Sequence, residues 1–152
     1  MSYKNENMKM IELHENGLDI QFRIRENGVV ELADFSSQEV KKAVMEPKDD
    51  ICYPAVEIHR SGTGSLNMHA YKNNINQSSV DFVYENHELK AQAGGKELEI
   101  VMISPEKLKA VYHMRLFDGV PAVQTWTEII NEGSEDQGLT YVSSFMYQGI
   151  SR

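Results

Sequence analysis

Cysteine is nearly absent from this sequence, because Cys52 is the only one among 152 residues. A disulfide within the chain and a cysteine-rich metal site are therefore both excluded. Long apolar runs are missing as well. The longest, Ile100–Ile103, is far shorter than the roughly 20 residues that a helix needs to cross a bilayer. We therefore expect no membrane partner.

Positive charge is also scarce. The chain carries 15 Lys and Arg against 23 Asp and Glu, which gives a formal net charge of −8. Nucleic acids and anionic membrane surfaces both bind basic patches, so neither is expected as a partner. The first ten residues are polar and contain no apolar signal-peptide segment. These features predict a cytoplasmic protein, with residues 1–9 frayed.

Among the aliphatic residues, the β-branched Val and Ile far outnumber Leu. Such β-branched residues favour strands. The clearest segment is 18–24, where apolar and polar residues alternate, as in a half-buried strand. Asn27-Gly28 follows, a pair typical of a turn in which both residues take positive φ. We therefore predict a hairpin whose second strand is 29–35.

Similar short alternating segments recur along the rest of the chain, separated by turn sequences such as Gly94-Gly95 and Asp118-Gly119. They predict strands over 55–59, 66–71, 80–84, 98–103, 110–116, 123–129 and 139–146. Ser36 and Glu39 have capping-box spacing, which predicts one or two helical turns near Ser37–Met45. The whole pattern predicts a single all-β domain over residues 1–152, an antiparallel β-sandwich.

Histidines are the first candidates for chemistry: His14, His59, His69, His87 and His113. Alternate strand residues share a face, so Glu57 and His59 could join His69 around an ion. No second paired motif accompanies them, and a polar strand face is the favoured interpretation. We predict no metal site and no cofactor.

Catalytic patterns are equally weak. The carboxylates that could form a glycosidase pair are Asp49, Asp50, Asp81, Asp118 and Glu128. None stands out as a pair, and Asp118 suits its turn. The glycine-rich segment 62–66 has neither the G-x-S-x-G order nor a following Gly-Lys-Ser/Thr. Cys52 has no activating neighbour and is interpreted as a packing or loop residue, so no catalytic residue is predicted.

Trp126 is the only tryptophan. Its parity neighbours on the predicted strand are Gln124 and Glu128, whereas the alternate set is more apolar. Trp126 is therefore expected on the less apolar face. It could stack on a sugar or anchor another layer or subunit, and packing is the favoured role for a strand aromatic.

Two stretches together resemble a known family. One reads FDGVPAVQTWTEIINEG over residues 117–133, followed by LTYVSSF over 139–145. The other reads YPAVEIHRSG over residues 53–62, with His69 and Lys72 beyond it. They resemble the N-terminal domain of family 36 glycoside hydrolases, the α-galactosidases or melibiases. The similarity extends from about Gly17 to the end of the chain.

The resemblance implies a fold and a division of labour. This region of the family is the first part of a β-supersandwich of the galactose-mutarotase type, and it precedes a barrel. The barrel carries both catalytic aspartates of a retaining glycosidase, so neither role falls on a residue of this chain. The chain is therefore expected to lack the C-terminal catalytic barrel and not to be an enzyme on its own.

One family feature is missing. Some members carry Tyr-Pro-Thr-Tyr-Gly and Asp-Phe-Arg elements in a loop that reaches a neighbouring subunit's active site. The corresponding stretch here, Glu46–Cys52, is short and has neither element. The resemblance therefore assigns no sugar-binding residue to this chain.

Three functions are compatible with these features, in decreasing order of preference. The first is a non-catalytic β-domain that serves domain and subunit packing in an α-galactosidase-like hydrolase acting on α-galactosides. The second is a stand-alone carbohydrate-binding module, and the third is a small mutarotase-like enzyme. A homo-oligomer is expected, with interface residues in 122–130 or 139–147. The interface candidates are Trp126, Tyr141 and Phe145.

Overall fold

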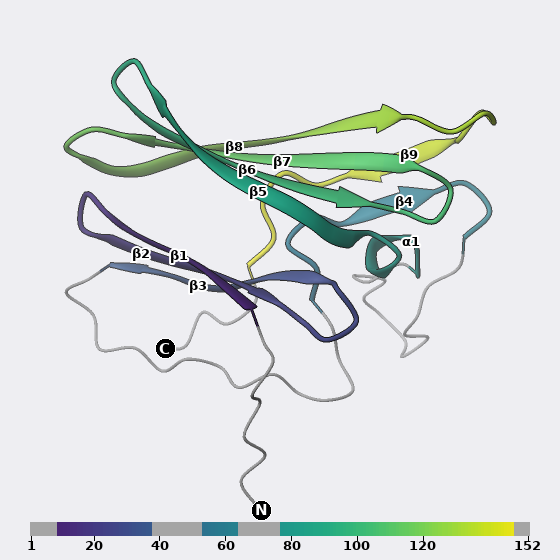
Figure 1. The fold of residues 1–152 in the computed structure, drawn as a ribbon, viewed down its shortest axis with the longest axis horizontal. Helices are drawn as coiled ribbons and strands as arrows, with labels where there is room; N and C mark the ends of the chain where they lie inside the picture. The colour runs from purple at the N-terminus through teal and green to yellow at the C-terminus, as the bar shows by residue number, and fades with distance from the viewer. Residues whose placement is uncertain (1–8, 38–52, 64–76, 148–152) are drawn as a thin grey trace, which may run out of the picture.

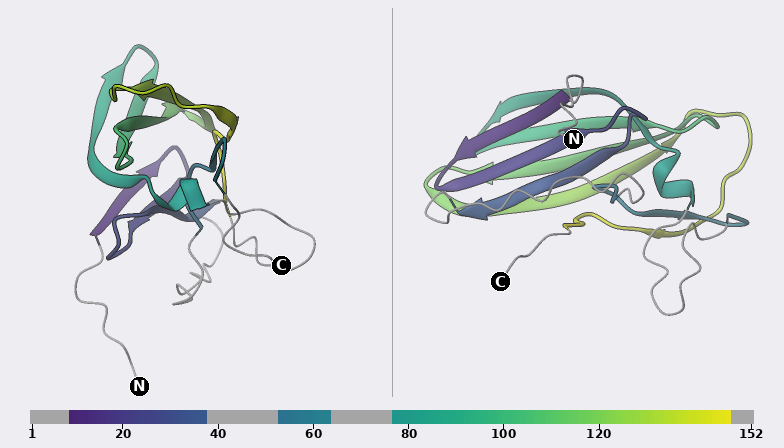
Figure 2. Two further views of the ribbon diagram at one scale, coloured as in Figure 1. Left: turned by 90° about the vertical axis from the view of Figure 1, so that its right-hand side faces the viewer. Right: turned by 90° about the horizontal axis from the view of Figure 1, so that it is seen from below.

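The structure is a computed structural model that describes residues 9–37, 53–63 and 77–147. Of these residues, 63% lie in strands and 4% in helix, so the predicted all-β class is confirmed. The strands form three antiparallel sheets with the orders β1-β2-β3, β4-β9 and β5-β6-β7-β8. The two larger sheets face each other as the layers of a sandwich, and the β4–β9 pair lies towards one end (Figures 1 and 2).

The first sheet contains the hairpin predicted from the alternating segment. Its strands are β1 (Lys9–Glu15), β2 (Leu18–Ile24) and β3 (Val30–Ser37). Strand β2 has the predicted bounds, but the turn after it differs from the prediction. Gly28 N donates to Arg25 O, and of the Asn27-Gly28 pair only Gly28 has positive φ. The connection is therefore longer than two residues.

Strand β1 was not predicted, and Lys9 belongs to it rather than to a frayed end. Only Ile11 and Leu13 mark its buried face, which is too short a pattern to recognise. The tight two-residue turn lies here, since Asn16 and Gly17 both have positive φ and Glu15 pairs with Leu18.

The Asn16 side chain also joins the two layers of the sandwich. Its Nδ2 donates to Phe117 O at 2.8 Å, and its Oδ1 accepts from Gly119 N at 2.9 Å. Because these atoms lie at residues 117–119, where two strands of the other large sheet are connected, the β1–β2 turn is held against that sheet at this end.

The second layer comprises four long strands. These are β5 (Val83–Gln92), β6 (Gly95–Ile103), β7 (Leu108–Phe117) and β8 (Val120–Asn131). Each includes part of a predicted strand and is longer at one end or both. Strand β5 extends furthest beyond its prediction, because its polar stretch carries no apolar signal and is held by pairing with β6.

The third sheet pairs two short strands, β4 (Ile58–Arg60) and β9 (Leu139–Val142). The prediction of a strand over 139–146 was too long. Strand β9 ends at Val142. Ser143 N still donates to Glu57 O, but Glu57 N donates to the Ser143 side chain, at Oγ, rather than to a backbone carbonyl, both at 2.8 Å.

A short helix, α1 (Gln77–Val80), replaces the start of the strand predicted over 80–84. Two buried hydroxyls explain this change. Ser78 Oγ and Ser79 Oγ both donate to Ile58 O, and Ser79 Oγ accepts from Ile58 N at 2.9 Å. The helix is thus fastened to β4 by side-chain bonds that no periodicity records.

Two other predictions fall partly or wholly outside the described residues. Ser36 and Ser37, proposed as the start of a helix, end strand β3, so that part of the prediction is wrong. The remainder of that segment and the strand over 66–71 lie outside the described residues.

The hydrophobic core lies between the two large sheets. Phe22 of β2 meets Tyr112 of β7 edge to face, with ring centroids 5.7 Å apart, and both side chains are almost completely buried. On β8, Val123 and Ile129 pack against this core. The prediction that Trp126 lies on the opposite, less apolar face is confirmed.

Candidate functional site

The face of the β5–β8 sheet that points away from the core carries a cluster of ionisable side chains. Strands β6 and β7 alternate strictly here, with Leu98 and Met114 turned into the core and Glu97 and His113 turned outward. Glu99 lies directly opposite His113 in the antiparallel register, and His113 lies opposite Trp126. We call Glu97, Glu99, His113, Trp126 and Glu128 the outer-face cluster.

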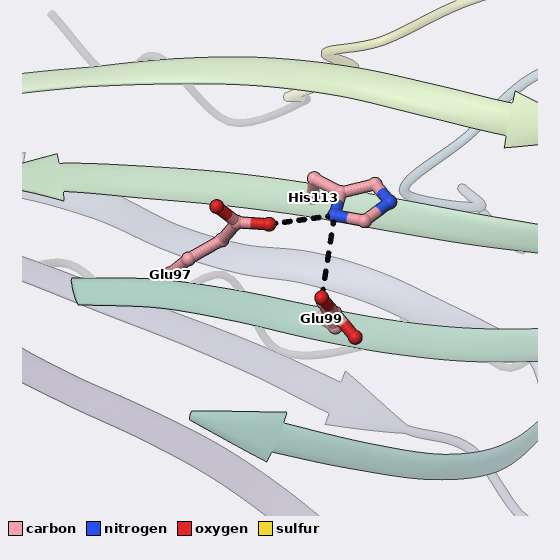
Figure 3. A group of neighbouring side chains, drawn as sticks. All are labelled: Glu97, Glu99 and His113. Carbon is pink, nitrogen blue, oxygen red and sulfur yellow. Dashed lines mark hydrogen bonds and ion pairs between the residues drawn. The ribbon is translucent and has the colours of Figure 1, made fainter. Parts of the chain in front are cut away.

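His113 is the centre of this cluster, and Figure 3 shows one of its ring nitrogens facing two carboxylates of the neighbouring strand. Its Nδ1 lies 3.0 Å from Glu97 Oε1 and 3.9 Å from Glu99 Oε1. Its Nε2 lies 3.8 Å from Glu128 Oε1, too far for a hydrogen bond, and has no hydrogen-bond partner. The imidazole is therefore surrounded by three carboxylates but bonded to only one.

Trp126 covers one side of this imidazole. The two rings are stacked with centroids 4.6 Å apart and planes only 5° from parallel. His113 is 7% exposed although it lies on an outer sheet face, because the indole and the adjacent carboxylates shield it. Trp126 itself is half-buried. The side chain on which it stacks, His113, belongs to the same sheet.

Two cations border the cluster. Lys90 Nζ lies 2.5 Å from Glu99 Oε2, and this hydrogen bond raises the pKa of Lys90 above its usual value. Arg115 is aligned with Glu97 in the register, but its guanidinium donates to Ala93 O and lies over the Phe117 ring. The cluster is thus charge-compensated at Glu99 and left anionic elsewhere.

This arrangement can hold a positive charge. A histidine beside several carboxylates can bind a proton as imidazolium, or it can present a ring nitrogen and carboxylate oxygens to a metal ion. A hollow of about 480 Å³ lies elsewhere, among the loops around Pro105–Lys107 and Glu132–Gln137. The described lining of that hollow includes no residue of the outer-face cluster.

Glu57, His59 and His69 are the possible metal ligands suggested by the sequence, and the structure describes two of them. Glu57 and His59 do converge, with His59 Nε2 lying 2.8 Å from Glu57 Oε1. His59 also packs against the Tyr141 ring, with centroids 5.1 Å apart. His69 lies outside the described residues, so the trio itself stays untested.

Two other histidines have local partners. His14 Nδ1 lies 2.5 Å from Asp19 Oδ1 on the first sheet. His87 Nδ1 lies 2.8 Å from the Tyr84 hydroxyl, and burial together with the nearby Lys9 charge lowers the pKa of His87. Neither belongs to the outer-face cluster.

The carboxylates weighed as a glycosidase pair are spread over the fold. Asp81 receives a hydrogen bond from Arg60 at 2.9 Å, and Asp118 lies in the β7–β8 turn. Among the members of that set that the structure describes, only Glu128 joins the outer-face cluster. Asp49, Asp50 and Cys52 lie outside the described residues.

The remaining interface candidates are accessible. Tyr141 on β9 is 49% exposed and Phe145 beyond it is 43% exposed. Phe145 meets Phe35 edge to face at 5.4 Å, so part of its ring already packs within the chain. Their role as interface residues stays a prediction.

Sequence reasoning considered His113 but missed Glu97 and Glu99 as its partners. The available signal was the Glu97-x-Glu99 spacing, which puts both carboxylates on one strand face. Locating His113 beside them required the register of β6 on β7, which depends on the turn at 104–107. There Ser104 N donates to Leu108 O at 2.9 Å.

Comparisons with known proteins add no identification. No protein-family model matches the chain, and no curated protein matches it. No helix in the described part of the chain is long and apolar enough to cross a membrane.

Proposed function

We propose that this chain is the non-catalytic N-terminal β-domain of an α-galactosidase-like glycoside hydrolase, and that it serves domain and subunit packing. The proposal starts from the two stretches that resemble family 36 glycoside hydrolases. It assigns the cleavage of α-galactosides to a barrel beyond this chain, and it gives this chain a structural role in a cytoplasmic enzyme.

The observation that carries the proposal is that the two stretches form one unit in space. The stretch at 53–62 contains β4, and the stretch at 139–145 contains β9, its antiparallel partner. Residues 117–133 contain β8, where Thr127 Oγ1 donates to Ser143 O at 3.0 Å. Segments distant in sequence that resemble one family therefore lie together, as parts of a shared fold would.

Exposed apolar side chains support the packing role. Leu139 and Tyr141 lie two residues apart on β9 and are 41% and 49% exposed, and Phe145 follows them. Strand β9 pairs with β4 alone among the described strands. Exposed apolar side chains beside a strand edge are typical of surfaces that another chain or domain covers.

The domain assignment predicts a sharp difference in activity. The product of the full gene should hydrolyse a chromogenic α-galactoside, whereas residues 1–152 alone should give no turnover, because the family's two catalytic aspartates lie in the barrel. Sequencing the gene past Arg152 identifies the full reading frame, whose product is then expressed and assayed beside residues 1–152. Turnover by residues 1–152 that a point change within them abolishes would contradict the proposal, as would a reading frame without a barrel.

The packing role predicts self-association through β9. Sedimentation should show a dimer or larger species at micromolar concentration, because repulsion from the net charge of −8 is screened over about 8 Å at physiological salt. Tyr141→Lys should shift the protein towards monomer by placing a charge in the interface. Val120→Lys is the matched control, since Val120 is 47% exposed but lies at the β7–β8 turn. A monomeric wild-type protein would count against this prediction.

A further inference from the structure

We infer that Glu97, Glu99 and His113 form a binding site for a divalent transition-metal ion, of which Zn²⁺ is the probe. The inference depends on the geometry of the outer-face cluster and not on the proposed glycosidase role. It goes beyond the metal trio considered from sequence, because none of its ligands belongs to that trio.

The distances between the candidate ligand atoms suit one small ion. One oxygen from each glutamate and one ring nitrogen of His113 all lie within 4.8 Å of one another. Zn²⁺ binds nitrogen and oxygen at about 2.1 Å, which separates two tetrahedral ligands by about 3.4 Å. The Nδ1 separations of 3.0 Å and 3.9 Å lie on either side of that value.

The unpartnered nitrogen of His113 is a second and independent observation. Nε2 is buried, has no hydrogen-bond partner and faces Glu128 Oε1 at 3.8 Å. When Nδ1 binds a metal, the ring proton resides on Nε2, and Glu128 is the carboxylate positioned to accept it. Metal-bound histidines usually donate their other N–H in this way, which orients the ring. Glu128 is therefore a positioning residue.

The net charge of the outer-face cluster also favours a bound cation. Glu97, Glu99 and Glu128 surround the ring, while Lys90 compensates only Glu99. The three carboxylates outnumber the two cations that border them, Lys90 and Arg115, by one negative charge. A bound cation offsets that excess.

The ligand types select the class of ion. One imidazole nitrogen with carboxylate oxygens suits Zn²⁺ and its transition-metal neighbours, whereas Mg²⁺ and Ca²⁺ prefer oxygen ligands alone. The stacked Trp126 blocks one face of the ring. Glu99 and Glu128 are the more accessible carboxylates of the cluster, with side chains 22% and 56% exposed, so the ion can enter from their side.

Titration of the 152-residue chain with Zn²⁺ tests the site, followed by calorimetry and by the emission of Trp126. Because Trp126 is the sole tryptophan and stacks on the proposed ligand, its emission reports this site. We expect saturable binding of one Zn²⁺ with a Kd tighter than about 100 µM. Mg²⁺ at the same concentrations should not change the emission.

Substitutions separate the site from non-specific binding. His113→Gln and Glu99→Gln should each weaken Zn²⁺ binding at least tenfold, and Glu128→Gln should weaken it by about tenfold through the lost orientation of the ring. Glu99 is partly exposed, so its variant is expected to fold even where the His113 variant does not. His14→Gln is the matched control, because His14 pairs with a single carboxylate on the other sheet.

Two outcomes overturn the inference. One is the absence of saturable binding up to about 1 mM Zn²⁺. The other is binding that Glu99→Gln leaves unchanged or that His14→Gln weakens equally. Circular dichroism of each variant at the titration temperature establishes that the comparison is between folded proteins.

Discussion

Truncation of Phe22 to alanine should lower the free energy of unfolding by about 3–5 kcal/mol. Phe22 is completely buried, and its ring meets Tyr112 across the interface between the two layers. Removing it creates a cavity that two rigid sheets cannot close. Because single domains are stable by only about 5–15 kcal/mol, the variant should be at or near the limit of folding.

Urea denaturation followed by far-UV circular dichroism measures this effect. Leu89→Ala is the matched control, because Leu89 is a large apolar residue of a sheet strand that is 43% exposed. The control should lose less than about 1 kcal/mol, since it leaves little buried surface unfilled. Similar losses for Phe22 and Leu89 would mean that the two sheets do not share the core described above.

The second large loss of stability is expected when Glu31 is substituted. Its buried carboxylate links β3 to the end of β2 and to the segment that begins at residue 53. Arg23 Nε and Arg25 Nη1 each donate to it at 3.1 Å, and Tyr53 N donates at 2.9 Å. Glu31→Ala leaves a buried arginine without this carboxylate, and loss of one member of such a pair costs about 3–5 kcal/mol. Thermal and urea denaturation of the variant measure the loss.

Glu12→Ala is the control for that experiment, because Glu12 is a glutamate of the same sheet with an exposed side chain. Its loss should be within about 0.5 kcal/mol of zero. Glu31→Gln keeps an acceptor oxygen of the same size and should fall between the two. A Glu31→Ala variant as stable as Glu12→Ala would show that the carboxylate contributes little to the fold.

Part of the architecture could be predicted from local pattern alone. In β2 and β7 every second side chain is apolar, and a strand with one buried face needs that alternation. The same reasoning placed Val123 and Trp126 on opposite faces of β8. Only a period of two is required for these predictions, so no knowledge of the partner strand was needed.

Other elements could not be predicted because their stability comes from distant partners. Strand β1 has only two buried apolar side chains and depends on pairing with β2. Helix α1 forms where Ser78 and Ser79 bond to Ile58 about twenty residues earlier. In each case the local sequence carries a weak preference, and a contact from elsewhere in the fold decides the outcome.

By itself, the sequence determined the fold class, the absence of an internal disulfide, the net negative charge and the face on which Trp126 lies. Only the tertiary structure decided which side chains meet. The register of β6 on β7 placed Glu99 opposite His113, and the register of β7 on β8 placed Trp126 beside it. A shift of one residue would turn each strand's side chains to the other face, so the outer-face cluster exists only because the buried core fixes the pairing.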